Sequence, residues 1–163
     1  MNYFAPLYQN LETLQSFYVE LEASLWEEHR GLISAEGERI EQANVSKEML
    51  LQKITLAEKN REALVLQIGQ QLGKPNASLK EIAEMAGDLR PQLLKKRDDL
   101  RTLIARVQDI NAQNREYAEN ALKVLGGALT NIKDTLSGKK TYQKKGKLGK
   151  GPEQAGHFVS REA

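Results

Sequence analysis

Apolar residues recur every three or four positions along most of the chain, which is the period of an amphipathic helix. The first such stripe has coiled-coil spacing and consists of Leu7, Leu11, Leu14, Tyr18, Leu21, Leu25 and Leu32. Pro6 directly precedes this stripe, and proline is well tolerated in the first turn of a helix. The pattern therefore predicts one long helix over about residues 6–33.

A second stripe alternates steps of three and four without interruption. It consists of Ile40, Ala43, Lys47, Leu50, Ile54, Ala57, Arg61, Leu64 and Ile68. Its register does not continue that of the first stripe, which would place the next core residue at position 39. We therefore predict a bend within residues 33–37, where Ser34-Ala35-Glu36-Gly37 offers turn and capping residues. A break at residues 44–46, with Ser46 as the N-cap, is the alternative placement.

Turn and capping residues mark two more helices. Gly73-Lys74-Pro75-Asn76 is expected to end the second helix, because glycine accepts a left-handed cap and proline cannot continue a helix. Ser78 and Glu81 have the spacing of a capping box, which predicts a short helix to about Ala86. Gly87-Asp88 then precedes the longest predicted helix, over about residues 89–136.

This last helix carries two apolar stripes that are offset around its axis. The proximal stripe is Leu93, Leu100, Leu103, Val107 and Ile110. The distal stripe is Ala118, Leu122, Leu125, Leu129, Ile132 and Leu136. The offset has two interpretations. Either the helix supercoils or contains a stutter, or the distal stripe faces a different partner from the proximal one. At 1.5 Å per residue the last helix would be about 70 Å long and the first about 40 Å, so part of the last helix would be left uncovered as a binding surface.

The predicted fold is all-α: an antiparallel bundle of three long helices plus one short helix, coiled-coil-like, with a disordered basic C-terminal tail. The composition agrees, since 28% of the residues are charged and only 6% are aromatic. Residues 139–163 hold seven basic and two acidic residues, a net charge of +5, which leaves −3 for residues 1–138. We therefore predict a helical domain over residues 1–138 and a flexible basic tail over residues 139–163.

Residue patterns for catalysis, metal binding and membrane insertion are missing from the sequence. There is no cysteine, and neither His29 nor His157 has metal-ligand spacing, so we predict no metal, no cofactor and no enzymatic activity. The chain has no apolar run of 18 residues, and its N-terminus lacks the basic start and apolar core of a signal peptide. These features predict a cytoplasmic protein that does not insert into a membrane.

Several motifs, taken in their order along the chain, resemble one known family. The last third reads Asn111-Ala112-Gln113-Asn114, then an apolar helix, then Thr141-Tyr142 with Gly146 four residues on. An earlier stretch has Leu32-Ile33, Glu36, Ile40, then Lys47-x-x-Leu50-Leu51 and Arg61. This order, over about residues 7–146, resembles the FlgN family of flagellar type III export chaperones.

The resemblance implies a cytosolic chaperone that binds the C-terminal helical segments of the two hook-filament junction proteins, FlgK and FlgL. Such a chaperone keeps the junction proteins unassembled and delivers them to the flagellar type III export gate. Cargo contacts in the family lie in the C-terminal part, which here corresponds to Asn111, Asn114, Ala118, Leu122, Leu125, Leu129, Ile132 and Leu136. The tyrosine that docks on the export gate corresponds to Tyr142.

The residues themselves leave alternatives open. Asn111 and Asn114 lie one turn apart, and they either contact cargo directly or set the register of the helix, as buried asparagine does in coiled coils. The distal stripe would also suit a coiled-coil scaffold or dimerisation module that carries no cargo, and a homodimer fits either reading. A weaker alternative is nucleic-acid binding through the lysine-rich tail, which the net acidic helical body disfavours.

Overall fold

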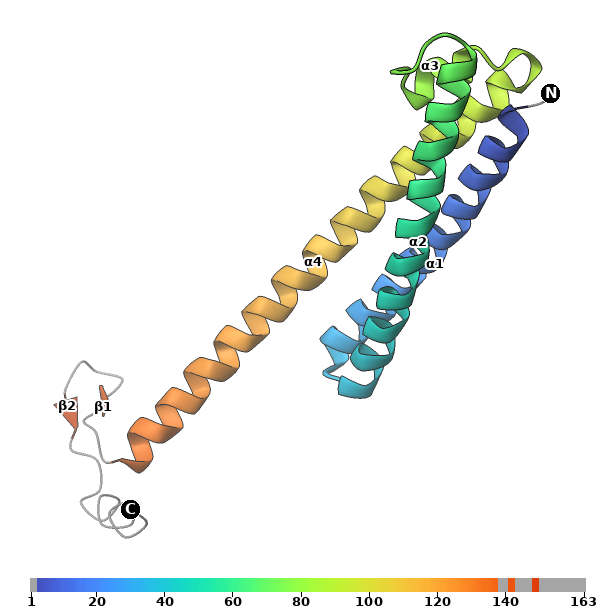
Figure 1. Ribbon diagram of the computed structural model, residues 1–163. Coiled ribbons are helices and arrows are strands. Elements are labelled where there is room, and N and C mark those ends of the chain that lie inside the picture. Colours follow the sequence, from blue (N-terminus) through green and yellow to red (C-terminus); the bar gives the residue numbers. More distant parts are fainter. Residues whose placement is uncertain (1–2, 138–140, 143–147, 150–163) are drawn as a thin grey trace. The chain divides into compact units, whose positions relative to one another are not determined.

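The computed structural model describes residues 3–137, 141–142 and 148–149 of the chain. Its elements are α1 (Phe4–Ser34), α2 (Gly37–Gln71), α3 (Leu79–Glu84), a 3₁₀ turn at Gly87–Leu89, α4 (Arg90–Leu136), β1 (Thr141–Tyr142) and β2 (Leu148–Gly149) (Figure 1). The expectation of an almost entirely helical protein is confirmed, with four α-helices in the described residues. The contacts divide the chain into two compact units, Met1–Arg115 and Glu116–Ala163. We refer to them as the N-terminal and C-terminal units.

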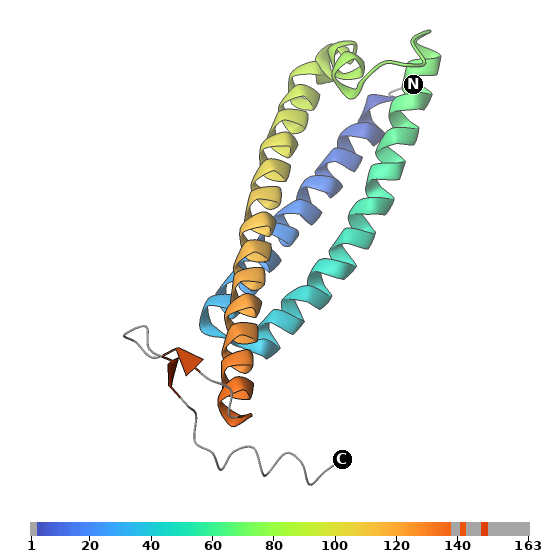
Figure 2. The same ribbon diagram turned by 90° about the vertical axis from the view of Figure 1, so that its left-hand side faces the viewer.

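A tight turn in the N-terminal unit joins α1 to α2 at the place that the change of register predicted. Ala35 has φ 55°, and the backbone N–H of Glu36 donates to the carbonyl of Gly31 over 2.9 Å. A Cβ atom on Gly31 would lie 2.9 Å from Cγ1 of Ile40, so glycine allows the two helices to approach closely here. The chain reverses within two residues, and Figure 2 shows α1 and α2 side by side.

Two side chains of α1 hydrogen-bond to the backbone of α2, and their partners show that the two helices are antiparallel. Nδ2 of Asn10 donates to the carbonyl of Ala57 over 3.1 Å. The hydroxyl of Ser24 donates to the carbonyl of Ala43 over 3.0 Å. Because the α2 partner moves toward the N-terminus as the α1 residue moves toward the C-terminus, the two helices run in opposite directions.

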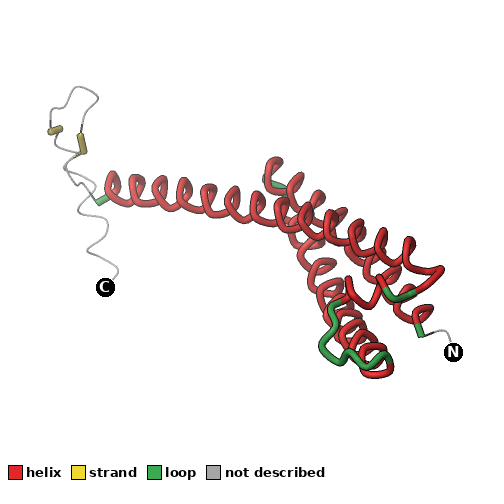
Figure 3. Tube along the Cα trace, turned by 90° about the horizontal axis from the view of Figure 1, so that it is seen from above, coloured by secondary structure: helices red, strands yellow, loops and turns green. Residues whose placement is uncertain are grey.

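The connection from α2 to α4 depends on glycine geometry and on the predicted capping box. A Cβ on Gly69 would meet the carbonyl oxygen of Lys74 at 2.5 Å, and Gly73 has φ +69°. The Ser78 hydroxyl caps the backbone N–H of Glu81, while the Glu81 carboxylate accepts from the backbone N–H of Ser78 over 2.8 Å. These bonds from Ser78 to the carboxylate lower the pKa of Glu81. In Figure 3 the loops that connect α2 to α3 and α3 to α4 are green.

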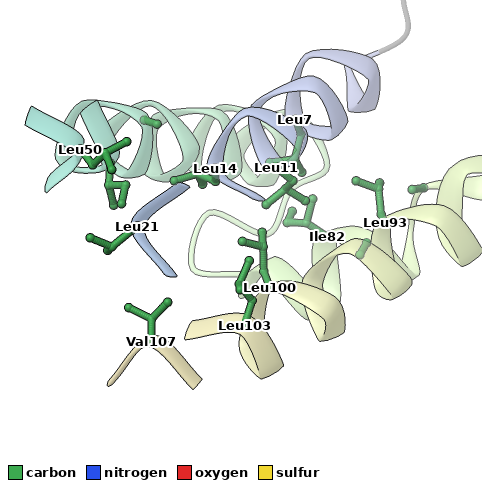
Figure 4. Close-up of a cluster of buried hydrophobic side chains, with 14 of the residues drawn as sticks. Leu7, Leu11, Leu14, Leu21, Leu50, Ile82, Leu93, Leu100, Leu103 and Val107 are labelled. Atoms are coloured by element: carbon green, nitrogen blue, oxygen red, sulfur yellow. The ribbon is translucent and has the colours of Figure 1, made fainter. Parts of the chain in front are cut away.

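The buried core of the N-terminal unit is formed largely by residues of the predicted stripes (Figure 4). Ile82, Ala83 and Ala86, in and just after α3, also belong to it, although no predicted stripe included them. Its fully or almost fully buried members are Leu7, Leu11, Leu14, Leu21, Leu25, Leu50, Ile54, Ala57, Ile68, Ile82, Ala83, Ala86, Leu93, Leu100, Leu103, Val107 and Ile110. Two polar contacts at the edge of this core show that α1 and the part of α4 in the N-terminal unit run in the same direction. Lys96 donates to Gln15 over 2.7 Å, and Arg106 donates to Glu22 over 2.9 Å.

Two very short strands, which the sequence did not predict, lie in the C-terminal unit. β1 and β2 pair antiparallel, with Thr141 opposite Gly149 and Tyr142 opposite Leu148. Threonine and tyrosine favour extended backbone, but a two-residue strand is too short to show alternation in a sequence. The rest of the predicted disordered tail, residues 139–163, lies outside the described residues.

Candidate functional site

The distal stripe is the largest run of exposed apolar side chains on α4. Its large residues have exposed fractions of 68% at Leu122, 60% at Leu125, 67% at Leu129, 56% at Ile132 and 62% at Leu136. Ala118, which begins the stripe, is half-buried. Because all six positions recur at steps of three and four, they share one face of the helix.

An exposed face of this kind indicates a binding surface. Single exposed leucines are ordinary, but a contiguous apolar run on a helix face marks an interaction site more often than not. The side chains of the distal stripe provide apolar anchors at helical spacing, which is the chemistry that recognises an amphipathic helix. The distal stripe is therefore our candidate functional site.

The two asparagines of the Asn-x-x-Asn motif have very different surroundings. Asn111 is exposed, whereas Asn114 is only 2% exposed. Nδ2 of Asn114 donates to the carbonyl of Leu25 over 2.8 Å and to Glu28 over 3.1 Å. Its Oδ1 lies 2.8 Å from Nδ1 of His29. All of these partners belong to α1, so the placement of Asn114 fits the interpretation that it sets the register of α4 against α1.

The carboxylate of Glu28 links this contact to α2. Glu28 is 9% exposed, and its Oε1 lies 2.7 Å from Nζ of Lys47, a second mostly buried charged group. A buried charge is tolerated only when it is paired and hydrogen-bonded, and Glu28 is both. Lys47 of α2, Glu28 of α1 and Asn114 of α4 therefore connect the three long helices within the N-terminal unit.

Neither Glu28 nor His29 was among the predicted site residues, although a signal was present for Glu28. Lys47 occupies a core position of the second stripe, and Glu28 continues the spacing of the first stripe between Leu25 and Leu32. Opposite charges at core positions of two antiparallel helices could have been matched as a pair. The contact from Asn114 across to His29 had no such signal, since it depends on how α4 packs against α1.

Tyr142, the predicted export-gate residue, lies in β1 opposite Leu148. Its predicted docking role is not tested by this placement and stays a prediction.

The described part of the chain contains no group of three or more His, Cys, Asp or Glu side chains arranged to hold a metal ion. None of its helices combines the length and the apolar composition that crossing a membrane requires.

The fold defines a class of protein, an all-helical, coiled-coil-like protein, and its exposed apolar face suits the binding of another helix. Residues 1–150 match the family model described as FlgN protein, so the chain belongs to the FlgN family. This confirms the resemblance seen in the sequence, and it makes the chain a flagellar export chaperone of a family that is not enzymatic. No curated protein and no solved structure matches the chain.

Proposed function

We propose that this FlgN-family protein is a cytosolic chaperone for the two hook-filament junction proteins, FlgK and FlgL. It binds their C-terminal helical segments, keeps them unassembled, and delivers them to the flagellar type III export gate. The observation that carries the proposal is the exposed distal stripe, where five large apolar side chains are each more than half exposed. Family membership supplies the flagellar setting.

The binding step is the folding of a cargo segment onto the distal stripe. A segment that is disordered before assembly can form an amphipathic helix whose apolar face covers the leucines of α4. Burying one leucine or isoleucine side chain contributes about 1.5–3 kcal/mol before the costs of ordering. Ordering the segment offsets a large part of this gain, which keeps the affinity moderate and allows the cargo to be released.

The predicted cargo-contact residues divide into two groups. The exposed amide of Asn111 and the apolar side chains of the distal stripe are available to a bound helix. Asn114 acts indirectly, because its amide is already engaged by Leu25, Glu28 and His29. In our proposal Asn114 fixes α4 in the N-terminal unit, and the distal stripe makes the apolar contact with cargo.

A charge placed on the stripe tests the cargo surface. Leu129→Glu should weaken binding of a peptide with the C-terminal sequence of FlgK or FlgL by at least about ten-fold, because it buries an unpaired carboxylate in the contact. The matched control is Val124→Glu, since Val124 is 73% exposed and Leu129 is 67% exposed. Val124 lies about 120° around the helix from the centre of the stripe at 100° per residue, so its substitution should leave binding unchanged.

Calorimetry on the full chain measures the affinity, and circular dichroism verifies that each variant is folded. Peptide binding that survives Leu129→Glu in a folded protein would contradict the cargo surface. Equal losses in both variants would point to a general effect of charge. Sedimentation with and without peptide separates cargo binding from self-association, because a cargo-free scaffold would form a stable dimer that the peptide does not change.

Tyr142 provides the test of delivery. We expect Tyr142→Ala to leave the affinity for the junction-protein peptide unchanged and to lower the amount of FlgK and FlgL exported by cells. Tyr142→Phe keeps the ring and is the matched control for the hydroxyl group. Loss of peptide binding in Tyr142→Ala would contradict a role restricted to docking on the export gate.

A further inference from the structure

Two adjacent glycines lie between Leu125 and Leu129 of the distal stripe, and neither has a geometric reason within the described structure. Gly31 and Gly69 are required by close packing, and Gly73 and Gly87 have positive φ. In contrast, a Cβ atom at Gly126 or Gly127 would meet nothing within 4 Å, and neither residue has positive φ. Both lie in the interior of α4, where glycine is the least favourable residue after proline because it loses the most backbone freedom.

Six of the ten residues after these glycines, 128–137, have lower helix propensity than alanine, leucine or lysine. The sequence of these ten residues is Ala-Leu-Thr-Asn-Ile-Lys-Asp-Thr-Leu-Ser, which contains β-branched and short polar residues at six positions. Thr130, Thr135 and Ser137 each donate their hydroxyl to the carbonyl four residues earlier, over 3.0, 2.8 and 2.8 Å. Such bonds slightly destabilise a helix and compete with its own backbone pairing.

Within the part of the chain that the structure describes, this segment also lacks the packing that stabilises most helices in proteins. Every residue from 128 to 137 is exposed apart from Asp134, which is half-buried. Most helical stability in proteins comes from a packed apolar face, so the end of a long helix that has none frays readily. Three of the apolar anchors, Leu129, Ile132 and Leu136, lie beyond the glycine pair, whereas Leu122 and Leu125 precede it.

We propose that Gly126 and Gly127 set the cargo affinity of the distal stripe by leaving residues 128–137 frayed in the unladen chaperone. This inference rests on the proposed function. Cargo binding completes the helix as the last three anchors are covered, and part of the binding free energy is used to order it. The glycine pair therefore weakens the complex and speeds its dissociation, which suits a chaperone that must hand over its cargo.

The test uses the full chain with Gly126→Ala and Gly127→Ala, singly and together. Alanine fits without a clash at both positions, so these variants should fold. Gly37→Ala is the matched control, since a Cβ at Gly37 also meets nothing within 4 Å but lies in α2, far along the chain from the distal stripe. Backbone amide exchange and circular dichroism report the unladen helix, and stopped-flow binding of a peptide with the C-terminal sequence of FlgL reports affinity and dissociation rate.

We expect the amides of residues 128–137 to exchange faster than those of residues 100–110 in the unladen wild type. The double variant should slow this exchange, raise helicity and tighten peptide binding on the order of ten-fold, mainly through slower dissociation. Gly37→Ala should change none of these. Equal exchange in the two segments of the unladen wild type would overturn the inference, as would a double variant that binds peptide no more tightly.

Weaker binding by the double variant would show instead that cargo packs closely against the glycines. That result contradicts fraying but leaves the proposed function intact. If the wild type binds no junction-protein peptide, the proposed function fails and the role in cargo affinity fails with it.

Discussion

The proximal and distal stripes of α4 contain the same kinds of residue at the same spacing but have opposite surroundings. Leu100 of the proximal stripe is 6% exposed, and Leu129 of the distal stripe is 67% exposed. Both lie in one continuous helix, and both belong to an apolar face of coiled-coil period. Apolar periodicity thus predicts that a helix has a face to bury, but the tertiary fold decides whether the same chain covers that face.

The two asparagines between the stripes show the same contrast in polar residues. Asn111 is exposed, while Asn114 is buried and satisfied by three partners on α1. A buried asparagine strongly favours the one alignment in which its hydrogen bonds are made. Asn114 is the last buried residue of α4, and Asn111 faces solvent one turn earlier.

The largest expected effect comes from shortening one leucine in each stripe. Leu103→Ala should destabilise the protein by about 2–5 kcal/mol, because it removes a side chain from the packed core and leaves a cavity. Leu129→Ala should change stability by less than about 0.5 kcal/mol, since its side chain is mostly in solvent. Urea denaturation followed by circular dichroism measures both. Similar losses of stability in the two variants would mean that the distal stripe is packed as firmly as the proximal one.

The asparagine pair gives the next largest effect. Asn114→Ala removes the hydrogen bonds to Leu25 and Glu28 and should destabilise the protein by about 1–3 kcal/mol, the usual range for leaving a buried polar partner unsatisfied. Asn111→Ala should stay within about 0.5 kcal/mol of the wild type. The same denaturation experiment measures both. A neutral Asn114→Ala would contradict its assignment as the residue that holds the register.

The capping box of α3 gives the smallest effect and depends on pH. Hydrogen bonds from Ser78 lower the pKa of Glu81, so its ionised form is favoured in the folded state. Stability from this group is therefore present above its unfolded pKa of about 4.5 and is lost as the pH falls below that value. Wild type should be more stable than Ser78→Ala at pH 7, and the difference should narrow at pH 3. An unchanged difference would show that the carboxylate does not contribute to the cap.

Most of the fold could be predicted from the sequence, because its signals are local. The register change between Leu32 and Ile40 located the turn at Ala35, and the spacing of Ser78 and Glu81 located the cap of α3. The cluster of Glu28, His29 and Asn114 could not be predicted in full, since it joins residues more than 80 positions apart. The strands at Thr141 and Leu148 were missed because two residues cannot establish a period.

Only part of the candidate site could be predicted from the sequence. The spacing of Leu122 to Leu136 showed that these residues share a face, and in the described structure the leucines and Ile132 of this face are each more than half exposed. Asn111 and Asn114 could not be told apart, because two residues one turn apart on a helix look equivalent until α1 is placed beside them. No local pattern carries that information.

Our central claim is that cargo covers the distal stripe, and methyl NMR of the full chain tests it most directly. Leucine and isoleucine methyl groups are assigned, and a peptide with the C-terminal sequence of FlgL is added to saturation. We predict large shift changes at Leu122, Leu125, Leu129, Ile132 and Leu136, with the buried methyls of Leu100 and Leu103 almost unchanged. Saturated binding that leaves the distal methyls unshifted, with changes confined to α1 and α2, would contradict the account.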